Sequence, residues 1–193
     1  MVDDGSEDQT EQVAKRYEGI RVIRNDRNLG KGESVRRGAL SASGALVLVV
    51  DADSSTPIGE FDRFIAQADA CDIVIASRYL PQSRTIVKQA LLRRLNSQVF
   101  RLLAGRLMGL RVSDSQCGFK LFRTEVVQAI FSSPFVGRLS FDVEILRRAK
   151  RLGLRVQEMP VQWDHRQGSK VNLLELARMY WDLLRVWLRA RSD

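Results

Sequence analysis

The chain has 193 residues, of which 45% are hydrophobic and 28% charged, and a formal net charge of +8. This length and composition suit one globular domain with a sizeable core, and they exclude disordered and fibrous proteins. The two cysteines, Cys71 and Cys117, lack metal-ligand spacing, so neither a zinc site nor a disulfide framework is expected. The acidic N-terminus does not read as a signal peptide, and no apolar run reaches the roughly 20 residues of a membrane span, so we expect a cytosolic protein.

The positive charge is concentrated in one stretch. Between Asp72 and Asp114 there is no other acidic residue, and the basic residues that fall there account for the whole excess: Arg78, Arg84, Lys88, Arg93, Arg94, Arg101, Arg106 and Arg111. A solvated helix face is the ordinary explanation of such a block. Its functional explanations are nucleic acid, a phosphorylated ligand or an anionic membrane.

The first half alternates strand-like and helix-like segments. Val2 is typical of a strand end that runs into an acidic turn over residues 3–6, with a helix starting over 7–10. Strands are expected at 21–25, 45–53 and 72–79, and helices at 31–42 and 57–69, the second opened by Thr56 as N-cap. Continuous apolar strands that alternate with helices indicate an α/β fold, with a mainly parallel sheet and helices on both faces.

The second half is expected to be mostly helical. One long amphipathic helix is predicted over 86–108, a strand over 119–122, a helix from Ser140 to near Gly153, and a strand over 155–163. The last helix, 171–190, has a broad apolar face that includes Tyr180 and Trp187, and the helix also carries Trp181 and is rich in arginine. Such a helix would either dock on its own domain or lie in a membrane interface.

The run LVLVVDADSSTP carries the strongest single signal. A buried strand delivers Asp51 and Asp53 to its carboxyl end, where open α/β sheets bind ligands. Residues two apart in an extended segment point the same way, so both carboxylates can face one site and hold Mg²⁺ or Mn²⁺ together with a substrate phosphate. For an isolated D-x-D pattern, a strand-end turn with Asp as a helix cap is the commoner explanation.

Three further polar clusters are individually weak. The segment NLGKGESVRRG does not match the P-loop motif. It predicts a glycine-rich turn followed by a helix that begins at Lys31, and this helix N-terminus is a candidate anion site. DSQCGFKLF places Asp114 in a loop beside the sheet, and WDHRQGSK places several charges before the last helix. Solvated charge would explain each cluster equally well.

The order of the motifs is far more specific. VDDGSxDxT, NxGKG, DADxSTPI, SRY, DxQCGFKLF, FDVE and GSK follow one another across nearly the whole chain. In this order the sequence resembles the family 2 glycosyltransferases of the GT-A fold, most of all the dolichyl-phosphate β-glucosyltransferases and slightly less the dolichol-phosphate mannose synthases. The resemblance implies a GT-A catalytic domain over residues 1–170 and a C-terminal amphipathic helix, a candidate membrane-interfacial segment, over 171–193.

The same resemblance implies a shortened N-terminus. Members of the family begin with a strand and a P-x-Y-N-E turn ahead of the acidic turn that here starts at Asp3. We therefore expect an N-terminally truncated fold without its first strand, through either an internal start codon or a genuinely shorter protein.

Residue roles follow from the matched motifs. The resemblance places Asp3, Asp4 and Lys31 at the nucleotide, Asp51 and Asp53 at the metal, and Asp51 also at the diphosphate. Arg78 and Arg93 with Ser97 match positions that hold phosphate groups, and Asp114 matches an active-site acid whose role is left open. A late phosphate-binding loop is matched by Arg166, Ser169 and Lys170.

The implied reaction is an inverting transfer of glucose from UDP-glucose to a polyprenyl phosphate. A phosphate oxygen is already ionised near neutrality, so no strong general base is required. The resemblance implies a peripheral protein on the cytoplasmic face of a membrane, contacted by the basic and C-terminal helices, or anchored by a partner protein; nucleic acid is not an expected partner. The alternatives are GDP-mannose as donor, a soluble acceptor, or a non-catalytic remnant.

Overall fold

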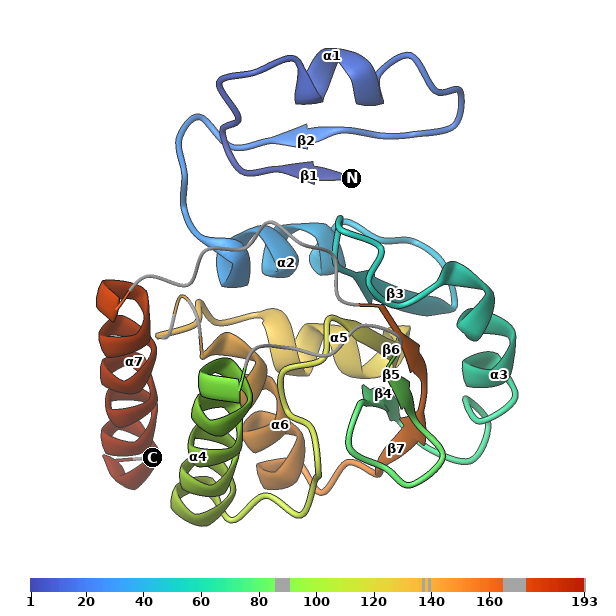
Figure 1. Cartoon of the computed structure of the whole chain (residues 1–193). Coiled ribbons are helices and arrows are strands. Elements are labelled where there is room, and N and C mark those ends of the chain that lie inside the picture. Colours follow the sequence, from blue (N-terminus) through green and yellow to red (C-terminus); the bar gives the residue numbers. More distant parts are fainter. Residues whose placement is uncertain (86–90, 137, 139, 165–172, 193) are drawn as a thin grey trace.

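The structure is a computed structural model that describes residues 1–85, 91–136, 138, 140–164 and 173–192. Figure 1 shows a small N-terminal layer above a larger α/β body. The layer consists of β1 (Val2–Asp3), α1 (Thr10–Ala14) and β2 (Ile23–Arg24), and its two strands pair in parallel. Helix α2 (Lys31–Leu40) lies between this layer and the body.

The body is built on a four-stranded sheet in the order β3 (Leu46–Val50), β6 (Phe119–Arg123), β4 (Ile73–Ser77) and β7 (Val156–Pro160). Strand β6 is antiparallel to both of its neighbours, and β4 is parallel to β7. Strands β3, β4 and β7 therefore run in one direction, which confirms the mainly parallel sheet. A separate short pair, β5 (Arg84–Thr85) and β8 (Gln162–Trp163), is also parallel.

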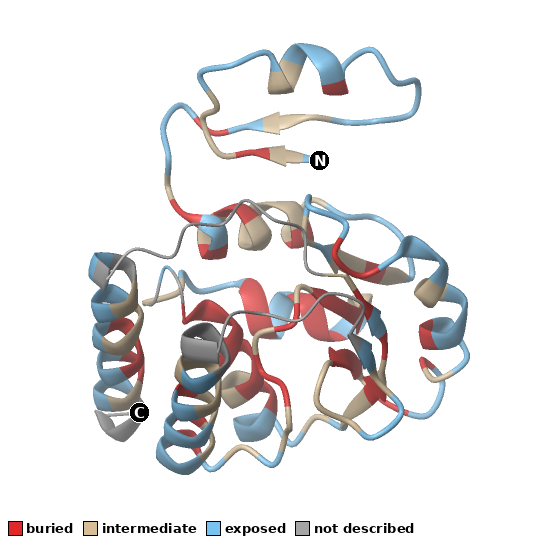
Figure 2. Ribbon diagram, in the orientation of Figure 1, coloured by how far each residue is buried: buried red, intermediate tan, exposed pale blue. Residues whose placement is uncertain are grey.

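Helices cover both faces of this sheet, as the strand pattern predicts. One face packs against α2, α5 (Thr124–Phe131) and α6 (Phe141–Arg151), with Phe122 and Ile145 in its core. The other face packs against α3 (Phe61–Ile65), which follows the 3₁₀ turn η1 (Ile58–Glu60), and Phe64 of α3 meets Phe119 edge to face at 5.0 Å. Because side chains alternate along a strand, neighbouring residues of β6 supply opposite cores, and Figure 2 shows the buried residues concentrated in this body.

A third core holds the two long helices. Helix α4 (Leu91–Met108) and helix α7 (Leu173–Ser192) bury Phe100, Leu183 and Val186 together with Val143 of α6. The rings of Phe100 and Tyr180 meet at 5.7 Å, and the Tyr180 hydroxyl donates to Asn96 Oδ1 at 2.8 Å. The C-terminal helix therefore docks on the domain through one face, although its opposite face stays exposed.

Several local predictions were wrong in detail. The helix expected over 57–69 begins as a 3₁₀ turn and its α-helical part ends at Ile65, and Thr56 does not cap it because its hydroxyl lies 3.9 Å from Cys117 Sγ in the core. Helix α6 does begin after Ser140, as predicted, and the Ser140 hydroxyl donates to the Met179 carbonyl at 3.0 Å. The strand expected over 155–163 is divided into β7 and β8, and α5 was not predicted.

Candidate functional site

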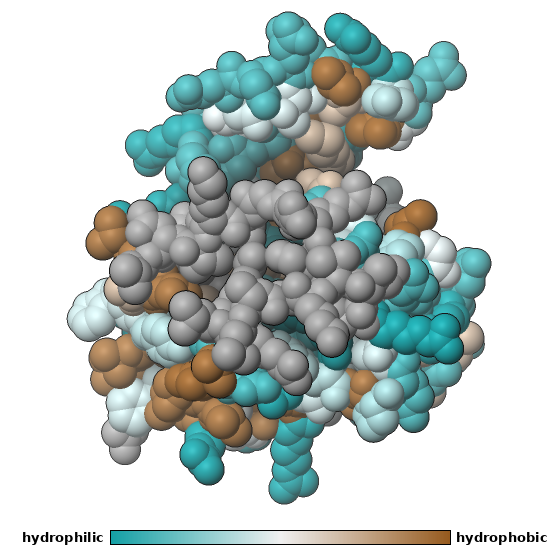
Figure 3. Space-filling view, in the orientation of Figure 1, coloured by the Kyte–Doolittle hydropathy of each residue, from teal (hydrophilic) through white to brown (hydrophobic). Residues whose placement is uncertain are grey.

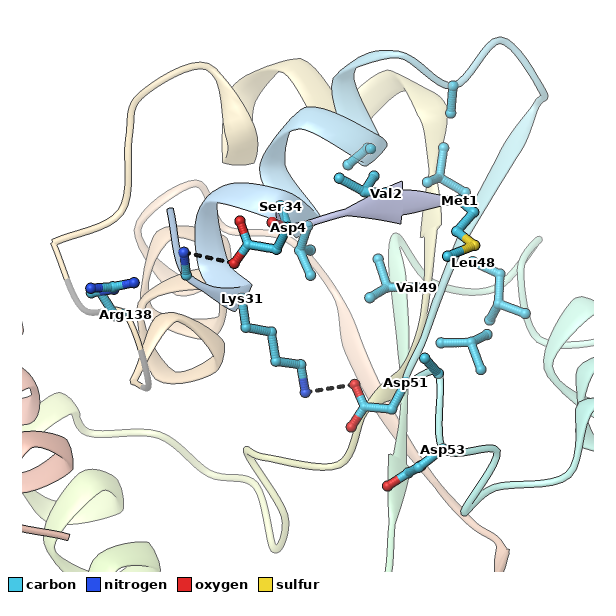
Figure 4. Close-up of a pocket in the computed structure, with 18 of the residues that line it drawn as sticks. Met1, Val2, Asp4, Lys31, Ser34, Leu48, Val49, Asp51, Asp53 and Arg138 are labelled. Carbon is cyan, nitrogen blue, oxygen red and sulfur yellow. Dashed lines mark hydrogen bonds and ion pairs between the residues drawn. The ribbon is translucent and has the colours of Figure 1, made fainter. Parts of the chain in front are cut away.

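A cavity of about 1210 Å³ lies between the N-terminal layer and the body. Strand β1 pairs with β2 and strand β3 pairs with β6, and among the described strands none lies between β1 and β3. One part of the cavity is apolar, with Val2 and Leu48 in its wall, and the other part is lined by charged side chains (Figure 4).

The acidic strand end forms one wall of the charged part. Asp51 and Asp53 both line the cavity, as their spacing after β3 predicts. The Asp51 amide donates to the Gly118 carbonyl at 2.9 Å, and the Ser55 amide donates to Asp53 Oδ1 at 2.9 Å. Ser54, which follows Asp53, has a φ of 53°, an uncommon conformation for a residue with a side chain. These constraints hold the two carboxylates in a tight, defined turn.

Lys31 faces this turn from the first residue of α2. Its Nζ atom lies 2.6 Å from Asp51 Oδ1 and 5.8 Å from the centre of the Phe141 ring. Figure 4 shows the side chain reaching across the cavity to Asp51, with Asp53 beyond it. Burial alone would lower the pKa of Lys31, but the carboxylates of Asp142, Asp51 and Asp53 outweigh it and raise the pKa above its ordinary value. The ammonium is therefore a fixed positive charge at the acidic edge.

The acidic turn of the N-terminal layer shapes the entrance to α2. Asp4 accepts hydrogen bonds from the Leu29 and Gly30 amides, both at 2.9 Å, and from Asn25 Nδ2 at 2.7 Å. Burial would raise the pKa of Asp4, but these donors lower it below its ordinary value. Asp4 lines the cavity, whereas the buried Asp3 carboxylate pairs with Arg24 at 2.7 Å. Of the two acidic residues Asp3 and Asp4, only Asp4 therefore lies at the cavity wall.

Asp114 and Arg78 form a bidentate ion pair, and neither residue lines the cavity. Arg78 Nε donates to Asp114 Oδ2 at 2.7 Å, and Arg78 Nη2 donates to Oδ1 at 2.9 Å. Asp114 is only 2% exposed, and its own amide donates to Glu158 at 2.9 Å. Burial would raise the pKa of Asp114, but the adjacent guanidinium holds it below its usual range. Asp114 thus fixes the position of Arg78, whose guanidinium also stacks near the Trp163 ring at 5.4 Å.

Lys120 and Asp142 form a buried ion pair that the sequence analysis missed, and the charge of Asp142 also acts on Lys31. Lys120 is 2% exposed in the central strand β6, and its Nζ donates to Asp142 Oδ1 at 2.5 Å and to the Cys117 carbonyl at 2.6 Å. A charged lysine is rarely buried without such partners. Asp142 belongs to the FDVE motif, which supported the family resemblance, but the sequence analysis gave no role to Asp142 itself.

Three further charged residues of the cavity wall were also missed. Arg138, Arg178 and Asp182 line it, and Arg138 Nη2 donates to Asn28 Oδ1 at 2.7 Å. Arg178 and Asp182 come from α7, so the C-terminal helix borders the cavity directly. The sequence analysis interpreted the last helix from its apolar face and its arginines. It did not single out Asp182, an acidic residue among those arginines.

Five further predicted residues belong to α4 or to the part of the sequence that precedes α7. Arg166, Ser169 and Lys170, together with the side chain of Arg93, lie outside the described residues. Ser97 is half-buried on α4 and does not line the cavity.

The donor set fits a divalent cation bound together with a phosphate. Among the described residues there is no group of three His, Cys, Asp or Glu side chains that could hold a metal alone. Mg²⁺ needs only one or two carboxylates when substrate phosphates and water complete its shell. Asp51 and Asp53 supply those carboxylates, and the ammonium of Lys31 shows that Asp51 accepts a cation from the cavity side.

Comparison with known proteins identifies the class to which this fold and site belong. Residues 1–131 match the family model described as glycosyl transferase family 2. This match covers more than half of the chain, which therefore belongs to glycosyltransferase family 2.

Similar proteins narrow the comparison. A dolichyl-phosphate beta-glucosyltransferase of Trichomonas vaginalis is 34% identical over 199 residues, covering 96% of this chain and 60% of that protein. The dolichyl-phosphate beta-glucosyltransferase of Homo sapiens is 34% identical over 203 residues, covering 98% and 63%. The chain thus spans about three fifths of the length of these relatives.

Solved structures confirm the GT-A fold. Glucosyl-3-phosphoglycerate synthase of Mycobacterium tuberculosis in complex with UDP is 23% identical, with a TM-score of 0.69, and the match covers 97% of this chain and 66% of that one. The same enzyme in complex with Mn²⁺, UDP-glucose and phosphoglyceric acid is 22% identical, with a TM-score of 0.67 and the same coverage.

Proposed function

We propose that this chain carries the catalytic domain of an inverting glycosyltransferase that moves glucose from UDP-glucose to a polyprenyl phosphate of the dolichyl type. The observation that carries the proposal is the meeting of Asp51 and Lys31 at 2.6 Å in a large cavity beside the Asp53 carboxylate. The relatives described above, which are dolichyl-phosphate beta-glucosyltransferases, support glucose and dolichyl phosphate, and the UDP-glucose complex of the structural neighbour supports UDP-glucose as donor.

The nucleotide sugar would occupy the charged part of the cavity. Lys31 at the start of α2 offers an ammonium to the diphosphate, and a helix N-terminus adds favourable amide dipoles. Asp4 holds the Leu29 and Gly30 amides in place and lies where a ribose hydroxyl can donate to it. Asp51 and Asp53 would hold Mg²⁺ or Mn²⁺, which neutralises charge on the departing diphosphate when bound.

The acceptor phosphate would be held by arginine. Arg78 is always protonated, and because Asp114 occupies its Nε and Nη2 atoms, a phosphate would contact the guanidinium through Nη1. Asp114 is a positioning residue in this scheme, since both of its oxygens accept from Arg78. The acceptor oxygen is already ionised near pH 7, so the residues have to place two anions side by side and stabilise the leaving group.

Membrane association belongs to the same proposal. No helix among the described residues has the length and apolarity needed to cross a bilayer. A polyprenyl phosphate stays in its membrane, and we propose that the catalytic domain reaches it on the cytoplasmic face, peripherally or beside an anchoring partner protein.

The proposal is tested by measuring UDP release and labelled lipid product from UDP-glucose, Mn²⁺ and a short polyprenyl phosphate. We expect product with this acceptor, less with GDP-mannose as donor, and none from the variant Asp53→Ala at unchanged folding. Asp62→Ala, an acidic residue of α3, is the matched control and should retain activity. Product formed on phosphoglyceric acid instead of the lipid would replace the proposed acceptor, and no product from a folded chain with any acceptor would leave a non-catalytic remnant.

A further inference from the structure

Lys120 is a charged side chain in the interior of the protein. Hydrophilic side chains cover much of the outer surface in Figure 3, whereas Lys120 is 2% exposed in the central strand β6. A buried ammonium costs free energy unless it is paired and hydrogen-bonded. An apolar side chain would fill this position without that cost, so the contacts of the ammonium have to account for the lysine.

The Lys120 ammonium joins two parts of the fold. Its Nζ atom donates to Asp142 Oδ1 on α6 at 2.5 Å and to the Cys117 carbonyl at 2.6 Å. Asp142 is itself only 6% exposed, so it is the counter-ion of the lysine in the interior. The second contact ties the ammonium to the backbone of the segment that leads from Asp114 into β6.

The next residue of that segment contacts the acidic edge of the cavity. Gly118 follows Cys117, and its carbonyl accepts the Asp51 amide at 2.9 Å. The Asp51 carboxylate occupies the space that a Cβ atom on Gly118 would take. Lys120 is therefore linked to Asp51 through the Cys117–Gly118 backbone.

The strand geometry places these groups on one face of the sheet. Side chains two residues apart in a strand point to the same face, so positions 118 and 120 share the face of Phe122, which packs against α6. Lys120 lies opposite Val49 in the β3–β6 register, and the hydrogen bond from Asp51 to Gly118 continues that register past the end of β3. The Asp51 carboxylate and the Lys120 side chain thus approach the Gly118 backbone from the same side.

We infer that Lys120 is a positioning residue whose ammonium, held by Asp142, fixes the Cys117–Gly118 backbone and keeps the Asp51 carboxylate turned toward the cavity. A hydrogen bond from a charged donor is about twice as strong as a neutral one, which suits this role. The consequence for a metal-bound nucleotide rests on the proposed function. The position of Asp51 does not, because it can be measured in the free protein.

The test measures amide hydrogen exchange by NMR in the free protein, at the two ends of the β3–β6 pair. One amide is that of Asp51, and the other is that of Thr124, which donates to the Ala45 carbonyl at 3.1 Å at the opposite end. The variant Lys120→Met/Asp142→Asn is compared with Asp142→Asn. These two proteins differ only in the lysine, and the double variant leaves neither charge of the buried pair.

We expect the protection of the Asp51 amide to be at least about tenfold lower in Lys120→Met/Asp142→Asn than in Asp142→Asn. A buried carbonyl that loses its donor changes an equilibrium by about that factor. Protection of the Thr124 amide should stay within about threefold, because the two amides report separate local openings. A lysine that served only general stability would lower protection at both ends alike.

Two outcomes of this comparison would overturn the inference: equal protection of the Asp51 amide in both variants, or an equal loss at Asp51 and Thr124. The parent protein supplies a further check that needs no variant to fold. Its Lys120 ammonium should give a slowly exchanging NMR signal, because it is buried and hydrogen-bonded. Rapid exchange of that ammonium would contradict the positioning role.

Calorimetry with UDP and Mn²⁺ separates this inference from the proposed function. We expect about tenfold weaker binding in Lys120→Met/Asp142→Asn than in Asp142→Asn, as is usual for groups that orient metal ligands. A selective loss of Asp51 protection in a chain whose parent binds no UDP with Mn²⁺ would leave the role of Lys120 standing and remove the proposed function. Normal binding with unchanged Asp51 protection would do the reverse.

Discussion

The carboxylate of Asp51 lies against the Cα atom of Gly118, in the space that a Cβ atom would occupy. The backbone of the same two residues is joined by the 2.9 Å hydrogen bond from the Asp51 amide to the Gly118 carbonyl. Residue 118 must therefore lack a side chain for Asp51 to keep its orientation, and a glycine between the Asp114 loop and β6 sets the geometry of the acidic edge.

Gly118→Ala should displace the Asp51 carboxylate. The overlap with the new methyl group is too close to be absorbed without movement, so we expect the affinity for Mn²⁺ in the presence of UDP to fall about tenfold or more, with a stability loss of about 1–3 kcal/mol. Calorimetric titration and urea unfolding measure the two effects. Gly59→Ala is the control, because a Cβ atom there meets nothing within 4 Å. Unchanged Mn²⁺ affinity in Gly118→Ala would mean that Asp51 is not a metal ligand.

Lys31→Met should separate metal binding from nucleotide binding. In the structure the Lys31 ammonium lies 2.6 Å from Asp51, where it repels a divalent cation. We expect Mn²⁺ alone to bind several-fold more tightly to the variant, and UDP with Mn²⁺ to bind about tenfold more weakly because a phosphate contact is lost. Electron paramagnetic resonance of free Mn²⁺ checks the first effect and calorimetry the second. Weaker binding of Mn²⁺ alone would contradict the competition.

Asp114→Asn should destabilise the fold in a pH-dependent way. Loss of one partner leaves the Arg78 charge buried and costs about 3 kcal/mol at pH 7. The pKa of folded Asp114 is lowered, so its stabilisation is complete above the ordinary carboxyl pKa of about 4 and is lost as the pH falls through the folded value. The free energy of unfolding of parent and variant should therefore converge below about pH 4. A constant difference down to pH 2 would show that the carboxylate charge is not the cause, and Asp26→Asn, at an exposed residue, serves as control.

The cysteines should be inert in the folded protein. Burial raises the pKa of Cys117 to about 11, and Cys71 is buried with a raised pKa as well. Since the thiolate is the reactive form, iodoacetamide at pH 8 should modify neither residue within minutes, whereas the urea-unfolded chain should be modified at both. Rapid labelling of Cys117 in the native state would place it at an open site instead of in the core.

The strand ends and the acidic edge could be predicted because each rests on a local pattern. A continuous apolar run followed by D-x-D predicts a strand end that carries two carboxylates, and Asp51 and Asp53 both line the cavity at the end of β3. Lys31 was found in the same way, from a glycine turn ahead of a helix. In these cases the information lies within a dozen consecutive residues.

The partners of these residues could not be predicted, because they depend on contacts between distant segments. Lys120 belongs to the predicted strand 119–122, but its burial depends on the central position of β6 and on Asp142, which neutralises it from α6. Thr56 reads as an N-cap, but the approach of Cys117 places its hydroxyl in the core. Arg101 reads as a solvated face of α4, whereas its guanidinium lies 4.5 Å from the Tyr79 ring and donates to the Ser113 carbonyl.

The most direct test of a nucleotide site in the cavity is calorimetric titration of the chain with UDP, with Mn²⁺ and again with excess EDTA. We expect saturable binding with one UDP per chain in Mn²⁺, at least tenfold weaker binding in EDTA, and a similar loss in Asp51→Ala with Mn²⁺. Equal affinity under all three conditions would contradict the assignment of Asp51 and its cavity to a metal-bound nucleotide diphosphate.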